Sequence, residues 1–596
     1  MRLNPSAAVF HLLRGVLLTL SVWSCIPAMA APISRDDPET TDLGRKRIST
    51  ARGRAVVVTA NPHASSAGLD ALKAGGNAID ALVSAQAVLA VVEPQSSGLA
   101  GGGFLLYWDA QARRLDVLDG REVAPERSQP DDLLSPSGTP IPWRDATSSP
   151  MAIGIPGTVA LLWDAHQQHG QLPWSEAMKP AIRLASDGFK PSPRFLRSLT
   201  LAQRFGVDHS PAFQALYLPG GQPPPADQRF RNPALARTLS SLARGGGRVF
   251  YRGPLAKRIL HGVNGLQSST PNFRGWSAAD LSNYAVVRRT PLCSAMLKHR
   301  ICTMPPPSSG GLGLLQTLAL LHQSSTLAGS SASDPKIWRR LAQAQAWADA
   351  DRLYWVHDPI DRPVPTAALL DPTYIANRSK EMQGAVGSRP QQGLPPGLTH
   401  YPFGRPAPGK EQGTSQITIV DNAGNIATYT SSVETVFGSR HLVEGMVMNN
   451  QLTDFSFRPT LQGEAVANRR QAGRRPMSSM APTIVFRRDD PVLAVGSPGG
   501  RSIPHLLSRV LLASLVWKET PHRAVGLPHL SNRRSGLVLE ADPPLSWPVG
   551  IDQLSGDEQS VRLQPIGSGV ALVQRLGDQW TGAADPRREG TALALP

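Results

Sequence analysis

Cysteine is nearly absent from this chain, which has three in 596 residues, so a disulfide-built scaffold is excluded. The sequence also contains no CxxC pair, no HExxH motif and no complete phosphate-binding loop, which argues against zinc and nucleotide chemistry. Glycine and proline, at 54 residues each, stay below the proportion that is typical of low-complexity disorder. Hydrophobic residues make up 41% of the chain, enough for a large core in about four domain-sized units or fewer large ones.

Negative charge is in deficit, because 61 Lys and Arg stand against 45 Asp and Glu and the net charge is +16. The densest basic cluster comprises Arg469, Arg470, Arg474 and Arg475, and no aromatic residue lies between them to stack on bases. We therefore expect no nucleic-acid partner. The excess is compatible with a solubilising surface or with contact to an anionic membrane surface.

Residues 1–30 have the features of a secretory signal peptide. Arg2 and Arg14 supply a positive start, Gly15–Trp23 is an apolar run, and Ala28-Met29-Ala30 is a small-x-small cleavage site. The apolar run is shorter than the ~20 residues of a comfortable membrane span, and an uncleaved anchor is the alternative. These features predict a periplasmic or secreted protein.

Removal of the signal leaves two cysteines, Cys293 and Cys302, on either side of a segment that can form a hairpin. In an oxidising compartment they can be joined by a disulfide. The alternative is a pair of free, buried thiols.

Past the signal, residues 31–54 are polar, charged and aperiodic, and we interpret them as a flexible leader. From residue 55 onward, helical and strand patterns interleave, which favours a mixed α/β layered fold. A Pro/Gly-rich stretch at 390–413 is the best candidate for an exposed, cleavable connection. Helical patterns occupy residues 67–90 with a break at 75–76, 158–169, 174–187, 235–244, 312–322 and 338–355, and strand patterns occupy residues 55–60, 104–108, 445–448, 483–486 and 492–495.

Two alternating segments at 415–420 and 426–432 flank a turn and predict a β-hairpin. Pairing Val420 with Ile426 places the hydroxyl of Ser432 opposite Thr414 at the start of the hairpin. A threonine hydroxyl needs a nearby base to act as a nucleophile, and a cut before Thr414 would create an α-amino group with a pKa of ~7.7–8.0. The same hydroxyl could make that cut by attacking the carbonyl of Gly413. On these residues alone a structural interpretation stays open, because threonine is also a good strand residue.

The predicted strand at 492–495 runs into Gly496-Ser497-Pro498-Gly499-Gly500. Adjacent glycines expose backbone N–H groups and allow close approach to a developing oxyanion. Taken alone, such a segment is more often an ordinary glycine turn between a strand and a helix.

Eight segments occur in a fixed order along the chain: GGNAIDALVSAQAVLAVVEPQSSGLAGGGF (75–104), DGREVAP (119–125), PPPSSGG (305–311), GTSQITIVDNAGNIATYTSSVETVFGS (413–439), NNQLTDF (449–455), RPMSSMAPTIV (475–485), GSPGG (496–500) and ADPRREG (584–590). Together they resemble the γ-glutamyltranspeptidases (glutathione hydrolases) of the N-terminal-nucleophile hydrolase group. The resemblance implies a four-layer αββα sandwich and a precursor that cleaves itself between Gly413 and Thr414. Its products would be a large chain with its globular part at 55–413 and a small chain at 414–596, held together as a heterodimer.

The resemblance also implies the catalytic roles. Thr414 matches the nucleophile with its own α-amino group as base, Ser432 matches a supporting hydroxyl, and Gly499 and Gly500 match the oxyanion hole. Attack on a γ-amide carbonyl would leave a γ-glutamyl ester on Thr414, which water or an amino-acid or peptide amine then resolves. No metal or organic cofactor is required.

The family recognises the free amino-acid end of a γ-glutamyl donor. An α-carboxylate requires a bidentate cation and hydroxyl donors, and an α-ammonium requires acceptors. Considered singly, these residues have structural alternatives: an ion pair of Arg121 with Glu122, a turn cap at Asp454, or a plain loop at 478–479. The matching residues are Arg121, Ser478 and Ser479 for the carboxylate and Glu434, Gln451 and Asp454 for the ammonium.

The chain departs from the family pattern where Thr414-Ser415-Gln416 replaces the common Thr-Thr-His, and where Ser432 replaces a frequent Thr. Residues 455–475 lie where some relatives carry a tyrosine-bearing lid, and they contain no Tyr, so water and bulky acceptors should enter more readily. Two alternatives stay open: a related acylase for glutaryl-type side chains, which lack the α-ammonium, and an uncleaved, inactive secreted binding protein of the same fold.

Overall fold

The computed structural model describes residues 47–204, 210–266, 273–323, 327, 329–384, 390–404, 413–533, 536–554 and 561–596. The predicted signal peptide, residues 31–46 of the predicted leader and residues 405–412 of the predicted connection lie outside this described part. Among its helices, none combines the length and the apolar character that crossing a bilayer requires.

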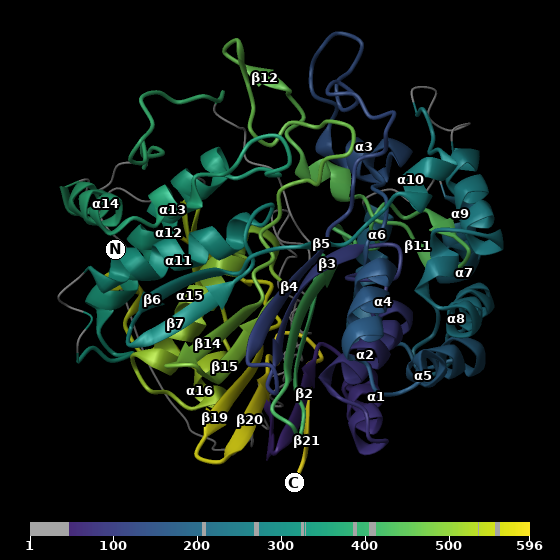
Figure 1. Cartoon of the computed structure of the whole chain (residues 1–596), viewed down its shortest axis with the longest axis horizontal. Helices are drawn as coiled ribbons and strands as arrows, with labels where there is room; N and C mark the ends of the chain where they lie inside the picture. Colours follow the sequence, from purple (N-terminus) through teal and green to yellow (C-terminus); the bar gives the residue numbers. More distant parts are fainter. Residues whose placement is uncertain are drawn as a thin grey trace, which may run out of the picture. The chain divides into compact units, whose positions relative to one another are not determined.

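Two seven-stranded antiparallel sheets form the centre of the described part (Figure 1). The first sheet has the order β1 (Ser49–Gly53), β20 (Gln579–Ala584), β19 (Ala571–Leu576), β15 (Asp490–Gly496), β14 (Thr483–Arg487), β7 (His299–Thr303) and β6 (Leu292–Met296). The second has the order β21 (Thr591–Leu595), β2 (Ala55–Thr59), β8 (Ser415–Val420), β9 (Ile426–Ser432), β3 (Gly102–Asp109), β4 (Arg114–Gly120) and β5 (Val287–Arg288). Smaller sheets pair β10 (Leu442–Val443) with β11 (Met446–Val447), β12 (Thr460–Leu461) with β13 (Glu464–Ala465), and β16 (Leu530–Arg533) with β17 (Gly536–Glu540) and β18 (Val561–Gln564).

Helices cover the outer face of each sheet (Figure 1). The second sheet is covered by α1 (Pro62–Lys73), α2 (Ala78–Val92) and α4 (Thr158–His169), with α3 (Trp143–Ser148), α5 (Trp174–Asp187), α6 (Pro193–Arg204), α7 (Pro211–Tyr217), α8 (Pro233–Gly245), α9 (Pro254–Gly265) and α10 (Ala278–Ser282) in the same part of the chain. The first sheet is covered by α11 (Ser309–His322), α15 (Ile503–Leu515) and α16 (Pro521–Gly526), with α12 (Pro335–Trp355), α13 (Thr366–Leu369) and α14 (Pro372–Gly384) beyond them.

Strand β2 shows how one sequence supplies both faces of its sheet. Val57 belongs to the core beneath α1 and α2, whereas Val56 and Val58 belong to the core between the sheets, where a Cβ atom on Gly582 of β20 would lie within 2.8 Å of both side chains. A buried strand presents alternate side chains to opposite faces, so an all-apolar run fits between a helix layer and a second sheet. The predicted four-layer αββα sandwich is therefore confirmed.

The predicted hairpin is β8–β9, and its register is the predicted one, from Val420 opposite Ile426 to Gln416 opposite Thr430. The helices predicted at 158–169 and 174–187 have the bounds of α4 and α5. One expectation is wrong: residues 49–53 of the presumed flexible leader form β1, which pairs with β20. The partner strand lies at the far end of the chain, so no local periodicity reveals the pairing.

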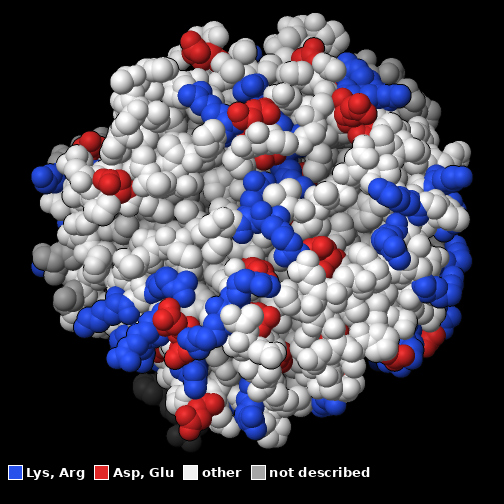
Figure 2. Space-filling view, in the orientation of Figure 1, with Lys and Arg blue, Asp and Glu red and all other residues white. Residues whose placement is uncertain are grey.

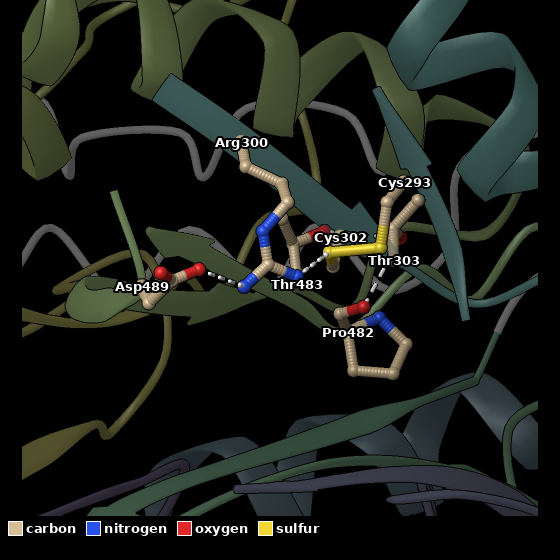
Figure 3. The surroundings of a disulfide bond; sticks show 7 residues. All are labelled: Cys293, Arg300, Cys302, Thr303, Pro482, Thr483 and Asp489. Atoms are coloured by element: carbon tan, nitrogen blue, oxygen red, sulfur yellow. Dashed lines mark hydrogen bonds and ion pairs between the residues drawn. A yellow bond between two sulfur atoms is a disulfide. The ribbon is translucent and has the colours of Figure 1, made fainter. Parts of the chain in front are cut away.

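Cys293 and Cys302 occupy paired positions on β6 and β7 and are joined by a disulfide (Figure 3). Cys302 is fully buried, and the hydroxyl of the adjacent Thr303 donates a hydrogen bond to the Pro482 carbonyl at 3.0 Å. Of the two alternatives left open by the sequence, the structure has the disulfide.

Candidate active site

The bond between Gly413 and Thr414 lies buried at the start of β8, where Thr414 is 3% exposed. Ser432 at the end of β9 donates its hydroxyl hydrogen to the Gly413 carbonyl oxygen. The same Ser432 oxygen accepts a hydrogen bond from the Glu434 backbone N–H at 2.8 Å. The predicted register thus brings a hydroxyl donor to the Gly413 carbonyl, which the Thr414 hydroxyl would attack in a cut at this bond.

Glycine is required at position 413 by the backbone that surrounds it. A Cβ atom placed there would lie 2.5 Å from the Glu434 carbonyl oxygen and 2.9 Å from that of Thr435. Only a residue without a side chain permits such an approach.

Arg588 holds the other side of the same peptide segment. Its guanidinium donates a hydrogen bond to the Thr414 carbonyl oxygen at 2.5 Å, and the side chain is 1% exposed. The loop that carries Arg588 is anchored by Asp585, which accepts from the Ser568 hydroxyl at 2.7 Å, and by Arg587, which donates to Glu540 at 2.8 Å. The sequence contained this residue in the segment ADPRREG but gave no signal of its contact.

The predicted carboxylate-binding and ammonium-binding residues meet in one buried ion pair. Arg121 donates to Asp454 at 2.6 Å, and Gln451 donates to the same Asp454 oxygen at 2.9 Å. Arg121 also donates to the carbonyl oxygen of Met477 at 2.9 Å, immediately before Ser478. A basic and an acidic group are therefore adjacent in a site from which water is largely excluded.

Glu122 lies beside this pair, 3.7 Å from the Arg121 guanidinium. Burial raises the pKa of Glu122 to about 8, although the nearby Arg121 opposes the shift. The carboxyl is tightly enclosed, because a Cβ on Gly102 would come within 2.6 Å of its oxygen. At neutral pH Glu122 is mostly protonated, so the positive charge of Arg121 remains available to Asp454 or to a ligand.

Arg475 fixes the backbone of Arg121. Its guanidinium donates to the Arg121 carbonyl at 2.8 Å and to Asp119 at 3.0 Å. Asp119 in turn accepts from the Arg121 backbone N–H at 2.9 Å. Although burial alone would lower it, Asp119 and Tyr284 hold the pKa of Arg475 above its usual range. From the sequence, Arg475 belongs to a basic cluster and begins the segment RPMSSMAPTIV, and neither feature indicates this contact.

The two predicted serines are held by α11 and α12. Arg352 donates to the hydroxyl oxygens of Ser479 and Ser309, at 2.9 Å and 2.8 Å. Arginine has donors only, so the Ser479 oxygen accepts this bond and the hydroxyl hydrogen is not used in it. The carbonyl of Ser478 accepts from the Ser309 backbone N–H at 2.6 Å. The sequence did not predict these contacts of Arg352.

Arg352 also connects this serine pair to the predicted oxyanion glycines. It donates to the carbonyl of Arg501 at 3.0 Å, directly after Gly499 and Gly500. Both glycines have positive φ, +135° and +52°, a conformation that favours glycine. They follow β15, which packs against β8 and β9.

Gln416, which departs from the family pattern, is buried between the two sheets, and both of its amide atoms form hydrogen bonds. Its amide oxygen accepts from the Thr430 hydroxyl at 2.5 Å, and its amide nitrogen donates to the Thr428 hydroxyl at 3.0 Å. A Cβ on Gly496 would come 2.1 Å from the same amide oxygen, so β15 leaves room for this side chain only because it has glycine there.

Glu434, the remaining predicted ammonium acceptor, is buried and has a left-handed backbone with φ +82°. Its loop is tied to the residue before Gln451, because the Asn450 backbone N–H donates to Val433 at 3.2 Å and the Asn450 side chain accepts from Thr435 at 3.0 Å. Strained backbone of this kind is common at functional sites. Within the described residues, no group of three His, Cys, Asp or Glu is arranged to hold a metal ion.

Known proteins with similar sequences and structures agree with the resemblance found in the sequence. The family described as Gamma-glutamyltranspeptidase matches residues 64–595. The chain is 31% identical to the glutathione hydrolase proenzyme of Bacillus subtilis (strain 168), over 98% of each chain, and 28% identical to an acylase ACY 1 proenzyme of Pseudomonas sp. (strain V22), over 94% of this chain and 96% of that one. The crystal structure of cephalosporin acylase from Bacillus halodurans shares the fold, with a TM-score of 0.80 at 23% identity over 93% of this chain and 97% of that one.

Proposed function

The chain belongs to the γ-glutamyltranspeptidase family, a family of hydrolases and transferases, and we propose that it cleaves itself before Thr414 and then cleaves γ-glutamyl amides such as glutathione. The observation that carries the substrate class is the buried pairing of Arg121 with Asp454 at 2.6 Å. A γ-glutamyl donor ends in a carboxylate and an ammonium on one carbon. Such a ligand exchanges partners with the ion pair, giving each charge a counter-charge without leaving either one unpaired.

The proposed self-cleavage begins at the bond between Gly413 and Thr414. The Thr414 hydroxyl oxygen attacks the Gly413 carbonyl carbon, and the hydrogen bond from Ser432 stabilises the charge that develops on the carbonyl oxygen. The C–N bond breaks, the nitrogen takes the proton that the attacking hydroxyl loses and becomes a free α-amino group, and Gly413 is left as an ester on the threonine oxygen. Water then hydrolyses this ester and leaves a Gly413 carboxylate.

Turnover uses the groups that this cut creates. The free amine takes the hydroxyl proton of Thr414 as the oxygen attacks the γ-amide carbonyl, and the backbone N–H groups of Gly499 and Gly500 stabilise the oxyanion. The leaving amine takes that proton, and a γ-glutamyl ester remains on Thr414. Water releases glutamate, or an acceptor amine forms a new γ-glutamyl amide.

Self-cleavage is tested by denaturing electrophoresis of the purified protein. The wild type should give two bands that remain associated under native conditions, whereas Thr414→Ala should give one band and no activity. Thr414→Ser keeps a hydroxyl and an α-amine and should still be processed. A wild-type protein that is intact at this bond and fully active would contradict the proposal, and one that is intact and inactive would favour the binding-protein alternative.

We also propose export, on the basis of the signal-like residues 1–30. N-terminal sequencing of the large chain should begin at Ala31. A mature protein that begins at Met1 and stays inside the cell would contradict this part of the proposal.

A glutaryl-type acylase is the second candidate, because two relatives are named as acylases. A glutaryl group has no α-ammonium, so it would leave Asp454 without a ligand partner. We therefore expect γ-glutamyl anilide to react with a higher kcat/KM than glutaryl anilide. Asp454→Asn should reduce the ratio of the two kcat/KM values, whereas Asp578→Asn, at an exposed position, should leave this ratio unchanged. A wild-type protein that prefers the glutaryl compound would support the acylase.

The balance between hydrolysis and transfer depends on what covers the site. Residues 455–475 contain the short β12–β13 hairpin and no tyrosine, and Gly404 donates to Ala465 in this hairpin at 3.1 Å. We propose that hydrolysis prevails. The check is the product ratio with and without glycylglycine, and a dominant transfer product would count against the proposal.

A further inference from the structure

The positive charge of this chain is concentrated in one segment. Residues 174–258 hold 14 Lys and Arg against four Asp and Glu, so they carry +10 of the net +16. The cluster that is densest in sequence does not supply this surface charge, because Arg470, Arg474 and Arg475 are buried and each lies in an ion pair with an aspartate. Most of the net positive charge therefore lies in the segment that runs from α5 to α9.

The helices of this segment pack against one another: α5 contacts α8, and both α8 and α9 contact the short turn Gly247–Phe250. Arg237 and Arg244 stand about two turns apart on α8 and so share a face. Arg248 on the turn and Lys257 on α9 continue the exposed surface. Figure 2 shows Lys and Arg side chains gathered along the edge that α8 and α9 occupy in Figure 1. We call these four residues the α8–α9 basic face.

None of the four cations forms an ion pair with another described residue. Two arginines elsewhere are, by contrast, matched by acids: Arg113, in the turn between β3 and β4, lies 3.1 Å from Asp490, and Arg300 on β7 lies 3.9 Å from Asp489. The α8–α9 basic face thus keeps its charge available for an external anion. Concentrated, unmatched charge also costs folding free energy through self-repulsion, which an anionic partner relieves.

The chemistry of the face indicates what that partner is. The large hydrophobic side chains exposed in the described part all lie outside residues 174–258, so this surface offers neither rings to stack on bases nor an apolar wedge for insertion. Lys and Arg side chains are both attracted to the anionic phosphates of a lipid surface. We propose that the α8–α9 basic face holds the protein by electrostatics on a membrane surface rich in anionic phospholipid.

The test is co-sedimentation of the full-length processed protein with lipid vesicles. At low salt, we expect binding to phosphatidylcholine vesicles that contain phosphatidylglycerol, no binding to phosphatidylcholine alone, and release at salt high enough to screen the charges. A basic residue near such a surface contributes about fivefold in affinity, so Arg237→Gln/Arg244→Gln/Arg248→Gln should weaken binding on the order of a hundredfold. The matching Lys variant at the same three positions should retain binding.

The control removes the same charge elsewhere: Lys298→Gln/Arg487→Gln/Arg488→Gln, at exposed hairpin ends. It should bind vesicles nearly as well as the wild type, and both triple variants should keep γ-glutamyl activity in solution. Equal loss in the two triple variants would show that net charge alone matters and would overturn the proposal. Absence of lipid binding, or retention of duplex DNA by the α8–α9 basic face in preference to vesicles, would overturn it as well.

Discussion

Glu122→Gln should make the protein more stable than the wild type as the pH rises. Burial raises the pKa of the Glu122 carboxyl from 4.5 to about 8, so the folded protein keeps its proton over a range in which the unfolded chain has lost it. The stability that Glu122 contributes is thus present in full at acidic pH, falls through this window, and is constant above it. The slope is about 1.4 kcal/mol per pH unit for one proton, which gives about 2–3 kcal/mol between about pH 5 and pH 7.

The assay is urea unfolding of both proteins across this pH range, with the difference in free energy of unfolding plotted against pH. Glutamine has the same shape and cannot ionise, so all other titrations cancel in the difference. Asp578→Asn, at an exposed carboxyl, serves as the control for removing one acidic group. A flat line for Glu122→Gln would refute the reasoning, because it would mean that the buried carboxyl ionises as readily in the folded protein as in the unfolded chain.

The same ionisation affects ligand binding. Above about pH 8, a charged Glu122 lies 3.7 Å from the Arg121 guanidinium and competes with the ligand carboxylate. The KM of the wild type for a γ-glutamyl anilide should therefore rise at alkaline pH, and Glu122→Gln should remove this part of the rise. A KM profile that is the same in both proteins would contradict a link between Glu122 and Arg121.

Three further changes test individual contacts. Gly413→Ala places a Cβ 2.5 Å from the Glu434 carbonyl oxygen and should slow self-cleavage at least about tenfold. The control is Gly265→Ala, where a Cβ meets no atom within 4 Å, and it should leave the cleavage rate unchanged. Electrophoresis over time measures both rates. Arg588→Met removes the donor to the Thr414 carbonyl and should also slow cleavage about tenfold or more, and unchanged kinetics would show that Arg588 does not position the strand. Arg352→Lys replaces a planar fork with a single ammonium and should raise KM about tenfold with little change in kcat, while a fall in kcat alone would argue against a role in orienting Ser479.

The elements that the sequence predicted well are those whose signal is local. Strict alternation on both sides of a turn set the β8–β9 register, and that register placed Ser432 against the bond before Thr414. The strand at 49–53 escaped prediction because its partner, β20, lies at the other end of the chain.

The buried arginines escaped prediction for a related reason. Arg352 and Arg588 reach their partners across layers of the sandwich, and side-chain direction across layers follows from tertiary packing rather than from spacing. For Arg121, adjacency in the sequence was misleading, because its neighbour Glu122 suggested a local ion pair. In the structure the closer partner of Arg121 is Asp454, at 2.6 Å against 3.7 Å for Glu122.

Gln416 has a consequence for the pH dependence of the proposed reaction. The amide lies in a hydrogen-bonded network of threonine hydroxyls between the sheets, and neither an amide nor these hydroxyls change charge near neutral pH. The α-amine that a cut would create on Thr414 has an unperturbed pKa of ~7.7–8.0. With no titrating histidine at position 416, the acidic limit of kcat/KM should report that amine, and the alkaline limit should report Glu122. Glu122→Gln therefore separates the two groups, because it should remove the alkaline limit and leave the acidic limit, which belongs to the amine of the nucleophile itself.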